Sequence, residues 1–159
     1  MNRNGEQWRA VLDCNEILRQ RLMTWEVLLC KLTDGGCRSD KRLLAVLEQT
    51  LDLLDDGIER VCAAEETGPL PYAEEKFPRM RLLVEEVWRE HQALRAQVQA
   101  MKMELNSAAG PTLRATGMEL VQAVRAHICR NEEELIPALT DVCASITAAT
   151  PTEGYVGAG

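Results

Sequence analysis

The amino-acid sequence predicts an all-α fold, an up-and-down antiparallel four-helix bundle. Apolar residues recur at steps of three and four along four separate segments, which is the period of a helix with one buried face. Glycine, proline and asparagine interrupt this period at three places, and no segment alternates apolar with polar residues between hairpin turns. Four helices joined by short connections pack as antiparallel neighbours.

The first two apolar stripes lie in the first half of the chain. One covers residues 8–32 and stops at the Asp-Gly-Gly sequence of residues 34–36. The other covers residues 44–62, and Asp40 is placed to cap the start of its helix. Glycine and proline at 68–71 then end the pattern, so we expect a break there.

The third and fourth stripes form the second half. The third begins after Pro78, covers residues 83–105 and ends at the turn-forming residues 106–111. The fourth covers residues 112–147, and we expect Pro137 to kink or break its helix because proline lacks the backbone N–H that an inner turn needs.

Length and composition fit a single domain. The chain has 159 residues, of which 46% are hydrophobic, so we expect one domain over residues 1–148. Residues 149–159 are rich in proline, glycine and alanine, and we expect a flexible tail there.

Charge and cysteine content bound the partners and the compartment. Acidic residues outnumber basic ones by 25 to 18, and this negative charge disfavours nucleic-acid binding. No apolar run reaches the roughly 20 residues of a membrane helix, and residues 1–7 are polar. We therefore expect no membrane association, a cytoplasmic location and reduced thiols for the six cysteines.

The two histidines are the main candidates for chemistry. His91 and His127 each lie on the apolar stripe of a different helix, so both should point inward. A single inward histidine is more often a core residue with one hydrogen bond, but two of them near carboxylates favour a shared site. Glu132–Glu134 follow His127 by about one turn, so imidazole and carboxylate can bind one metal ion.

These segments resemble a known family. Residues 127–137 read HICRNEEELIP and resemble the fourth helix of hemerythrin-like (HHE cation-binding) domains, and residues 90–95, EHQALR, are similar to the third. The resemblance spans roughly residues 8–145. It implies a four-helix bundle made of two similar halves. In each half, one helix carries a histidine and the next carries a histidine and a carboxylate, and the two halves together bind two iron ions.

The first half departs from the pattern that the resemblance implies. Residues 13–17 parallel 90–94, which puts Cys14 where His91 stands, although Asn15 is also close to this position. Cys62 precedes Glu66 by four residues, so the two share a helix face. An ungapped count back from Pro71 instead places Val61 opposite His127.

The resemblance therefore implies a mixed ligand set. In the fourth helix the step of four reaches Asn131, a poor anionic ligand, and we choose Glu132. The expected ligands are Cys14, Cys62, Glu66, His91, His127 and Glu132. Thiolates favour iron, zinc or monovalent copper. We expect one or two iron ions, with zinc as an alternative. The sequence is consistent with a site that retains the metal and with one that has lost it, since buried cysteine also behaves as a small apolar residue.

The function expected from this site is binding or sensing of a small diatomic or redox ligand, rather than turnover. Because the chain has only two histidines, we do not expect it to share the oxygen-carrier function of hemerythrin. One alternative is a metal-free module for interaction or structure. Another is a redox switch in which Cys14 and Cys62 form a disulfide. A di-iron oxidase or peroxidase has the least support.

Overall fold

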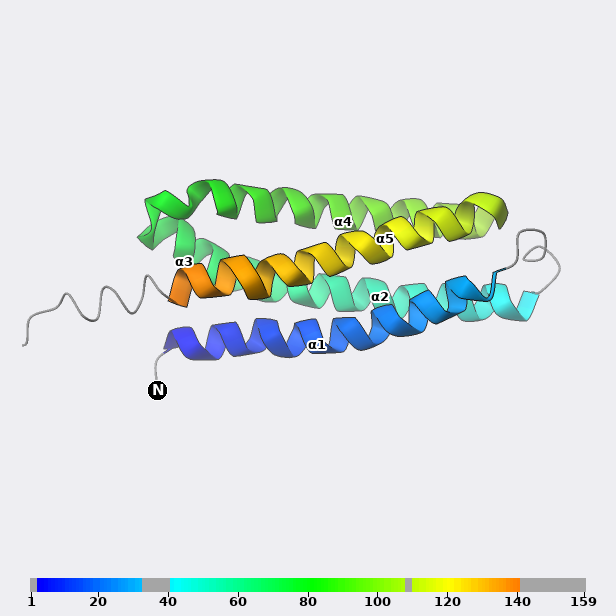
Figure 1. Ribbon diagram of the computed structural model, residues 1–159, viewed down its shortest axis with the longest axis horizontal. Coiled ribbons are helices and arrows are strands. Elements are labelled where there is room, and N and C mark those ends of the chain that lie inside the picture. The colour runs from blue at the N-terminus through cyan, green and yellow to red at the C-terminus, as the bar shows by residue number, and fades with distance from the viewer. Residues whose placement is uncertain (1–2, 33–40, 108–109, 141–159) are drawn as a thin grey trace, which may run out of the picture.

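The structure, a computed structural model, describes residues 3–32, 41–107 and 110–140. Four long helices run alternately up and down in it (Figure 1): α1 (Arg3–Cys30), α2 (Lys41–Thr67), α4 (Arg81–Ser107) and α5 (Gly110–Arg130). This confirms the predicted all-α, up-and-down four-helix bundle. The expected cap at Asp40 and the expected tail over 149–159 lie outside the described residues.

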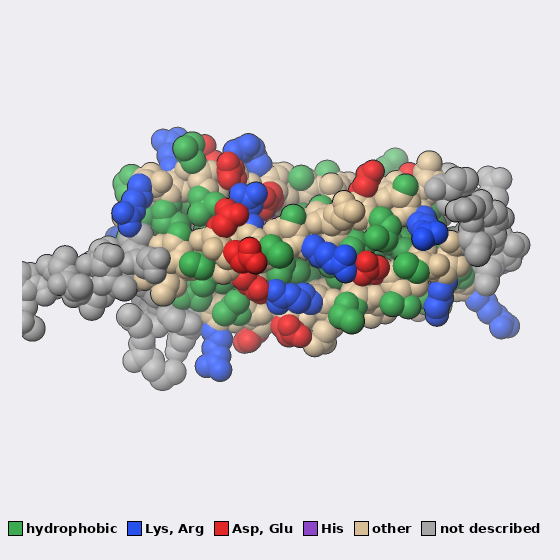
Figure 2. Space-filling view, in the orientation of Figure 1, with side chains coloured by type: hydrophobic (Ala, Val, Ile, Leu, Met, Phe, Trp, Pro, Cys, Tyr) green, Lys and Arg blue, Asp and Glu red, His purple; other side chains and the backbone are tan. Residues whose placement is uncertain are grey.

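Each long helix packs against two others. α1 contacts α2 and α5, and α4 contacts the same two helices, so the four surround one interior. Every helix turns its apolar stripe inward, as the spacing predicts. Outward faces carry opposite charges close together (Figure 2), such as Arg125 and Glu26 at 2.6 Å. None of the described helices combines the length and the apolarity needed to cross a bilayer.

The connection between α2 and α4 is itself helical. Helix α3 (Pro69–Lys76) and a 3-10 turn (Pro78–Met80) fill the region where the sequence predicts only a break. Proline suits the first turn of a helix because the N–H it lacks would have no partner there. Leu70 and Phe77 are buried, so the connection also closes one end of the core.

The last helix changes its geometry near Pro137. Residues Asn131–Leu135 form a π-helical segment, and the helix then continues to residue 140. In a regular α-helix the Pro137 ring would clash with the carbonyl of Glu133. The wider π turn directly before the proline offers a way around that clash, and such turns occur often at functional sites.

A layer of buried polar side chains divides the core into two clusters. The main cluster lies toward the end of the bundle where α1 ends and α2 begins, and it contains Leu22, Trp25, Leu51 and Val98 among others. The end cluster lies beneath α3 and contains Leu70, Phe77, Val84 and Leu135 among others. Between them lies the polar layer, whose members are buried and come from all four long helices and the π-helical segment: Asn15, Glu65, His91, His127 and Asn131.

Candidate metal centre

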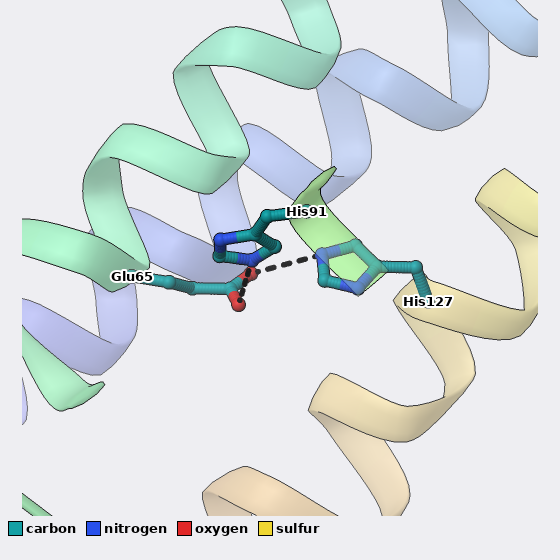
Figure 3. A group of neighbouring side chains, drawn as sticks. All are labelled: Glu65, His91 and His127. Atoms are coloured by element: carbon teal, nitrogen blue, oxygen red, sulfur yellow. Dashed lines mark hydrogen bonds and ion pairs between the residues drawn. The ribbon is translucent and has the colours of Figure 1, made fainter. Parts of the chain in front are cut away.

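Three side chains of the polar layer converge on one point. Glu65 comes from α2, His91 from α4 and His127 from α5, and all three are buried (Figure 3). His91 Nε2 lies 3.1 Å from Glu65 Oε2, and His127 Nε2 lies 3.3 Å from Glu65 Oε1. One ligand atom from each residue lies within 4.8 Å of the other two. A single carboxylate thus faces two imidazole nitrogens.

A second set of carboxylates holds the outer side of each imidazole. His91 Nδ1 lies 2.8 Å from Glu66 Oε1, and His127 Nδ1 lies 3.1 Å from Glu90 Oε2. A carboxylate on Nδ1 fixes the tautomer and the ring orientation of a metal-binding histidine, because it accepts the Nδ1 proton. Both rings are therefore oriented with Nε2 toward Glu65.

Arginines hold these outer carboxylates in turn. Arg95 donates from Nη1 to Glu66 Oε1 at 2.9 Å, and Arg130 Nε lies 2.7 Å from Glu90 Oε1. Burial raises the pKa of Glu66 and of Glu90, but the arginine and the imidazole beside each carboxylate outweigh it and lower both values. The outer carboxylates therefore stay ionised and remain acceptors for the Nδ1 protons.

The inner carboxylate and His127 form a strongly coupled pair. Burial acts to raise the pKa of Glu65, but hydrogen bonds from His127 and His91 outweigh it and lower that pKa. Burial acts to lower the pKa of His127, while Glu65 and Glu90 outweigh it and raise the pKa to about 9. Without a metal, a proton on His127 balances part of the buried negative charge.

The donor set fits a divalent transition metal. Two imidazole nitrogens and one carboxylate oxygen suit iron and zinc. Two donors bound to one ion at about 2.0–2.2 Å stand roughly 3 Å apart or more, which matches the 3.1 Å and 3.3 Å that separate the Glu65 oxygens from the two Nε2 atoms. A metal ion held by Glu65, His91 and His127 would displace the proton of His127, as metal binding to histidine requires.

Asn131 fixes the position of the inner carboxylate. It lies four residues after His127 at the start of the π-helical segment, and its Nδ2 donates to Glu65 Oε1 at 2.5 Å. The same nitrogen is 3.4 Å from His127 Nε2. Asn131 therefore orients Glu65 and contacts Nε2 of His127, the nitrogen that faces Glu65.

The structure separates the residues that the sequence analysis grouped. It brings His91 and His127 together, with ring centroids 5.1 Å apart. Glu66 is adjacent to them but contacts the outer nitrogen of His91. Glu132 instead faces α1, where it pairs with Arg19 and accepts a hydrogen bond from Asn15 Nδ2 at 3.4 Å.

The two cysteines of the expected ligand set do not belong to this cluster. Within the described ranges, the group that could hold a metal consists of Glu65, His91 and His127 and includes neither thiol. Cys62 is buried in the main cluster, where burial raises its pKa to about 12. Cys14 is half-buried against the same cluster, and burial raises its pKa as well.

Glu65 is the candidate ligand that sequence reasoning missed. The ungapped comparison of the two halves, which sets Val61 against His127, also sets Glu65 against Asn131. Both members of each pair are buried in the structure, as this alignment requires. The signal for Glu65 is therefore its position four residues after Val61, which matches the step from His127 to Asn131. Because valine cannot bind metal, this step does not stand out in the sequence.

A four-helix bundle with histidine and carboxylate donors from separate helices defines a class of cation-binding helical proteins. The family model of the hemerythrin HHE cation-binding domain matches residues 8–139. The chain therefore belongs to the hemerythrin HHE cation-binding domain family, as the sequence resemblance predicts. No match was found among curated proteins or among solved structures.

Proposed function

We propose that the protein binds iron through Glu65, His91 and His127 and uses it to bind or sense a small ligand or a redox state. The observation that carries this proposal is the orientation of both Nε2 atoms toward one buried carboxylate. Burying an ionised carboxylate costs several kcal/mol unless it is paired, and a metal ion between these donors would supply the positive charge.

Iron is favoured by the kind of donor. Two histidines and one carboxylate form the ligand set of many non-haem iron sites, and the cluster consists of these three donors. When bound, iron would supply a redox-active centre with coordination positions not taken by the protein. Glu66 and Glu90 accept the protons of the two Nδ1 atoms, so both imidazoles would present Nε2 to the metal once it has displaced the proton of His127. Zinc fits the same donors.

Metal titration of the purified protein tests this function. Protein prepared without chelator or nickel resin is titrated anaerobically with Fe(II) and separately with Zn(II), and bound metal is measured after desalting. We expect stoichiometric binding in the wild type and its loss in His91→Ala and in His127→Ala. Gln92→Ala, which changes an exposed neighbour of His91, is the matched control and should bind normally. A folded wild type that binds neither metal would refute the proposal.

The second candidate is a metal-free module of the same fold. It is favoured by the fact that the cluster can balance its own charges, since Glu65 has two imidazole partners and each outer carboxylate has an arginine. A protein that stays metal-free in both titrations, yet loses thermal stability when His127 is replaced by glutamine, would support this candidate. In that case the surface, rather than the interior, would carry the function.

A further inference from the structure

The two halves of the bundle repeat the same contacts around the polar layer. On one side His91 of α4 contacts Glu66 of α2, and Arg95, four residues further, binds the same carboxylate. On the other side Asn15 of α1 contacts Glu132 of the π-helical segment. Arg19, four residues after Asn15, again binds that carboxylate.

The remaining inward positions also form pairs. Glu65 directly precedes Glu66, as Asn131 directly precedes Glu132. Asn131 donates a hydrogen bond to Glu65. Val61 lies four residues before Glu65, as His127 lies four residues before Asn131, and both are buried. The polar layer and the positions beside it thus form two related half-sites that meet at the Glu65–Asn131 hydrogen bond.

Metal donors are concentrated in one of these half-sites. The donor half-site contains Glu65, His91 and His127. The amide half-site has Asn15 at the position of His91 and Asn131 at that of Glu65, and Val61 stands opposite His127. Valine offers no donor atom, and an amide oxygen is a neutral ligand that suits magnesium or calcium better than iron or zinc.

The single carboxylate of the amide half-site is already paired. Glu132 binds the Arg19 guanidinium through one oxygen and the Asn15 amide through the other. Any second ion would have to displace this cationic side chain while gaining one anionic ligand and no imidazole. The arrangement therefore opposes a second ion next to the first.

We propose that the protein binds one transition-metal ion per chain, in the donor half-site, because Asn15, Val61 and Asn131 remove the ligands that a second ion would need. This inference rests on the proposed function, since it fixes the number of ions at the same centre. It also assigns Arg19 and Glu132 a structural role, as the ion pair that fills the second position.

Native mass spectrometry of protein loaded with Zn(II), and anaerobically with Fe(II), counts the ions directly. One ion per chain is the expected result. Two ions per chain would overturn the inference and leave the proposed function standing, whereas no ion would overturn the proposed function and the inference with it. The two failures are therefore distinguishable in one experiment.

A matched pair of variants locates the bound ion. Glu132→Gln should keep one ion with an affinity within about threefold of the wild type, while Glu65→Gln should lose it. Both changes replace a carboxylate by an amide of the same size, Glu65 within the polar layer and Glu132 beside it. Loss of the ion in Glu132→Gln would show that Glu132 is a ligand and would overturn the inference.

Restoring the missing donors gives the strongest test. The combined variant Asn15→His, Val61→His, Asn131→Glu should raise the count from one ion to two. A variant that is folded by circular dichroism and still binds one ion would overturn the assignment of these three positions. If the combined variant does not fold, the wild-type count and the Glu132→Gln result decide the question.

Discussion

Glu65 and Asn131, 66 residues apart in sequence, are joined by a hydrogen bond of 2.5 Å across the interior of the bundle. They occupy corresponding positions in the two halves of the chain. The bond holds the carboxylate of Glu65 so that each of its oxygens faces one imidazole. At this pair the donor half-site has an acid and the amide half-site has an amide, and the candidate metal centre contains the acid.

Substitution of Glu65 distinguishes the observed cluster from the ligand set expected from sequence. Glu65→Gln should reduce bound iron or zinc at least tenfold, because it removes the only anionic donor of the cluster. Cys14→Ala and Cys62→Ala should each retain full metal content, since neither thiol belongs to that cluster. Metal analysis after desalting measures all three. Equal loss of metal in the cysteine variants would support the mixed thiolate site expected from the sequence.

The outer carboxylates should tune affinity without binding metal. Glu90→Gln should weaken metal binding by about 10–100-fold, because partners on the outer nitrogen of a metal-binding histidine typically have effects of that size. Glu86→Gln is the matched control: Glu86 also contacts Arg130, at 3.0 Å, but among the described residues it contacts no imidazole. Competition with a chromogenic chelator measures both affinities. Equal affinities in the two variants would argue against a role for Glu90.

Stability of the metal-free protein should fall as the pH rises. The pKa of His127 is about 9 in the folded protein, above its ordinary value of about 6.5. The stabilisation is therefore fully present below about pH 6.5 and is lost as the pH rises through 9. The difference corresponds to about 3 kcal/mol in the free energy of unfolding. Urea denaturation at pH 6 and pH 9.5 in the presence of chelator measures this change.

His127→Gln provides the control for this pH dependence. The amide has similar size and does not titrate, so the variant should lose most of the difference between the two pH values. Affinity of the wild type for Zn(II) should change in the opposite direction and rise with pH, because the metal competes with the proton on His127. Wild-type stability that is equal at both pH values would contradict the coupling of His127 to Glu65 and Glu90.

The thiols should differ widely in reactivity. Cys30 and Cys129 are exposed, whereas burial raises the pKa of Cys62 to about 12. Because the thiolate is the reactive form, Cys62 should react with iodoacetamide at pH 8 at least a hundredfold more slowly than Cys129. Peptide mass spectrometry after timed labelling measures both rates. Rapid labelling of Cys62, or a reversible Cys14–Cys62 disulfide under mild oxidation, would support the thiol switch instead.

The fold follows from the sequence because helical periodicity is a local property. The stripe from Trp8 to Leu32 recurs at helical spacing, so its assignment does not depend on knowing the neighbouring helices. The sequence predicts a break where helix α3 lies, because proline ends helices as well as starting them, and Pro69 and Pro71 are consistent with either. Whether these prolines end a helix or start one depends on whether Leu70 can pack against the core, which is a matter of tertiary structure.

The candidate site follows from the sequence only in part, for a physical reason. His91 and His127 were found because an imidazole on an apolar stripe is a strong signal. Glu65 and Glu66 are adjacent acids near a helix end, and a shift of one residue, about 100° around the helix, decides which of them faces the interior. Sequence spacing could not resolve that shift. The contact between Asn131 and Glu65 resolves it in the structure.

X-ray absorption spectroscopy of the metal-loaded wild type tests the central claim most directly, because it identifies the atoms bound to the ion. Binding through Glu65, His91 and His127 predicts a first shell of nitrogen and oxygen at about 2.0–2.2 Å for zinc, with the multiple scattering of two imidazoles and no sulfur. A sulfur shell at about 2.3 Å, or a spectrum without imidazole scattering, would contradict it.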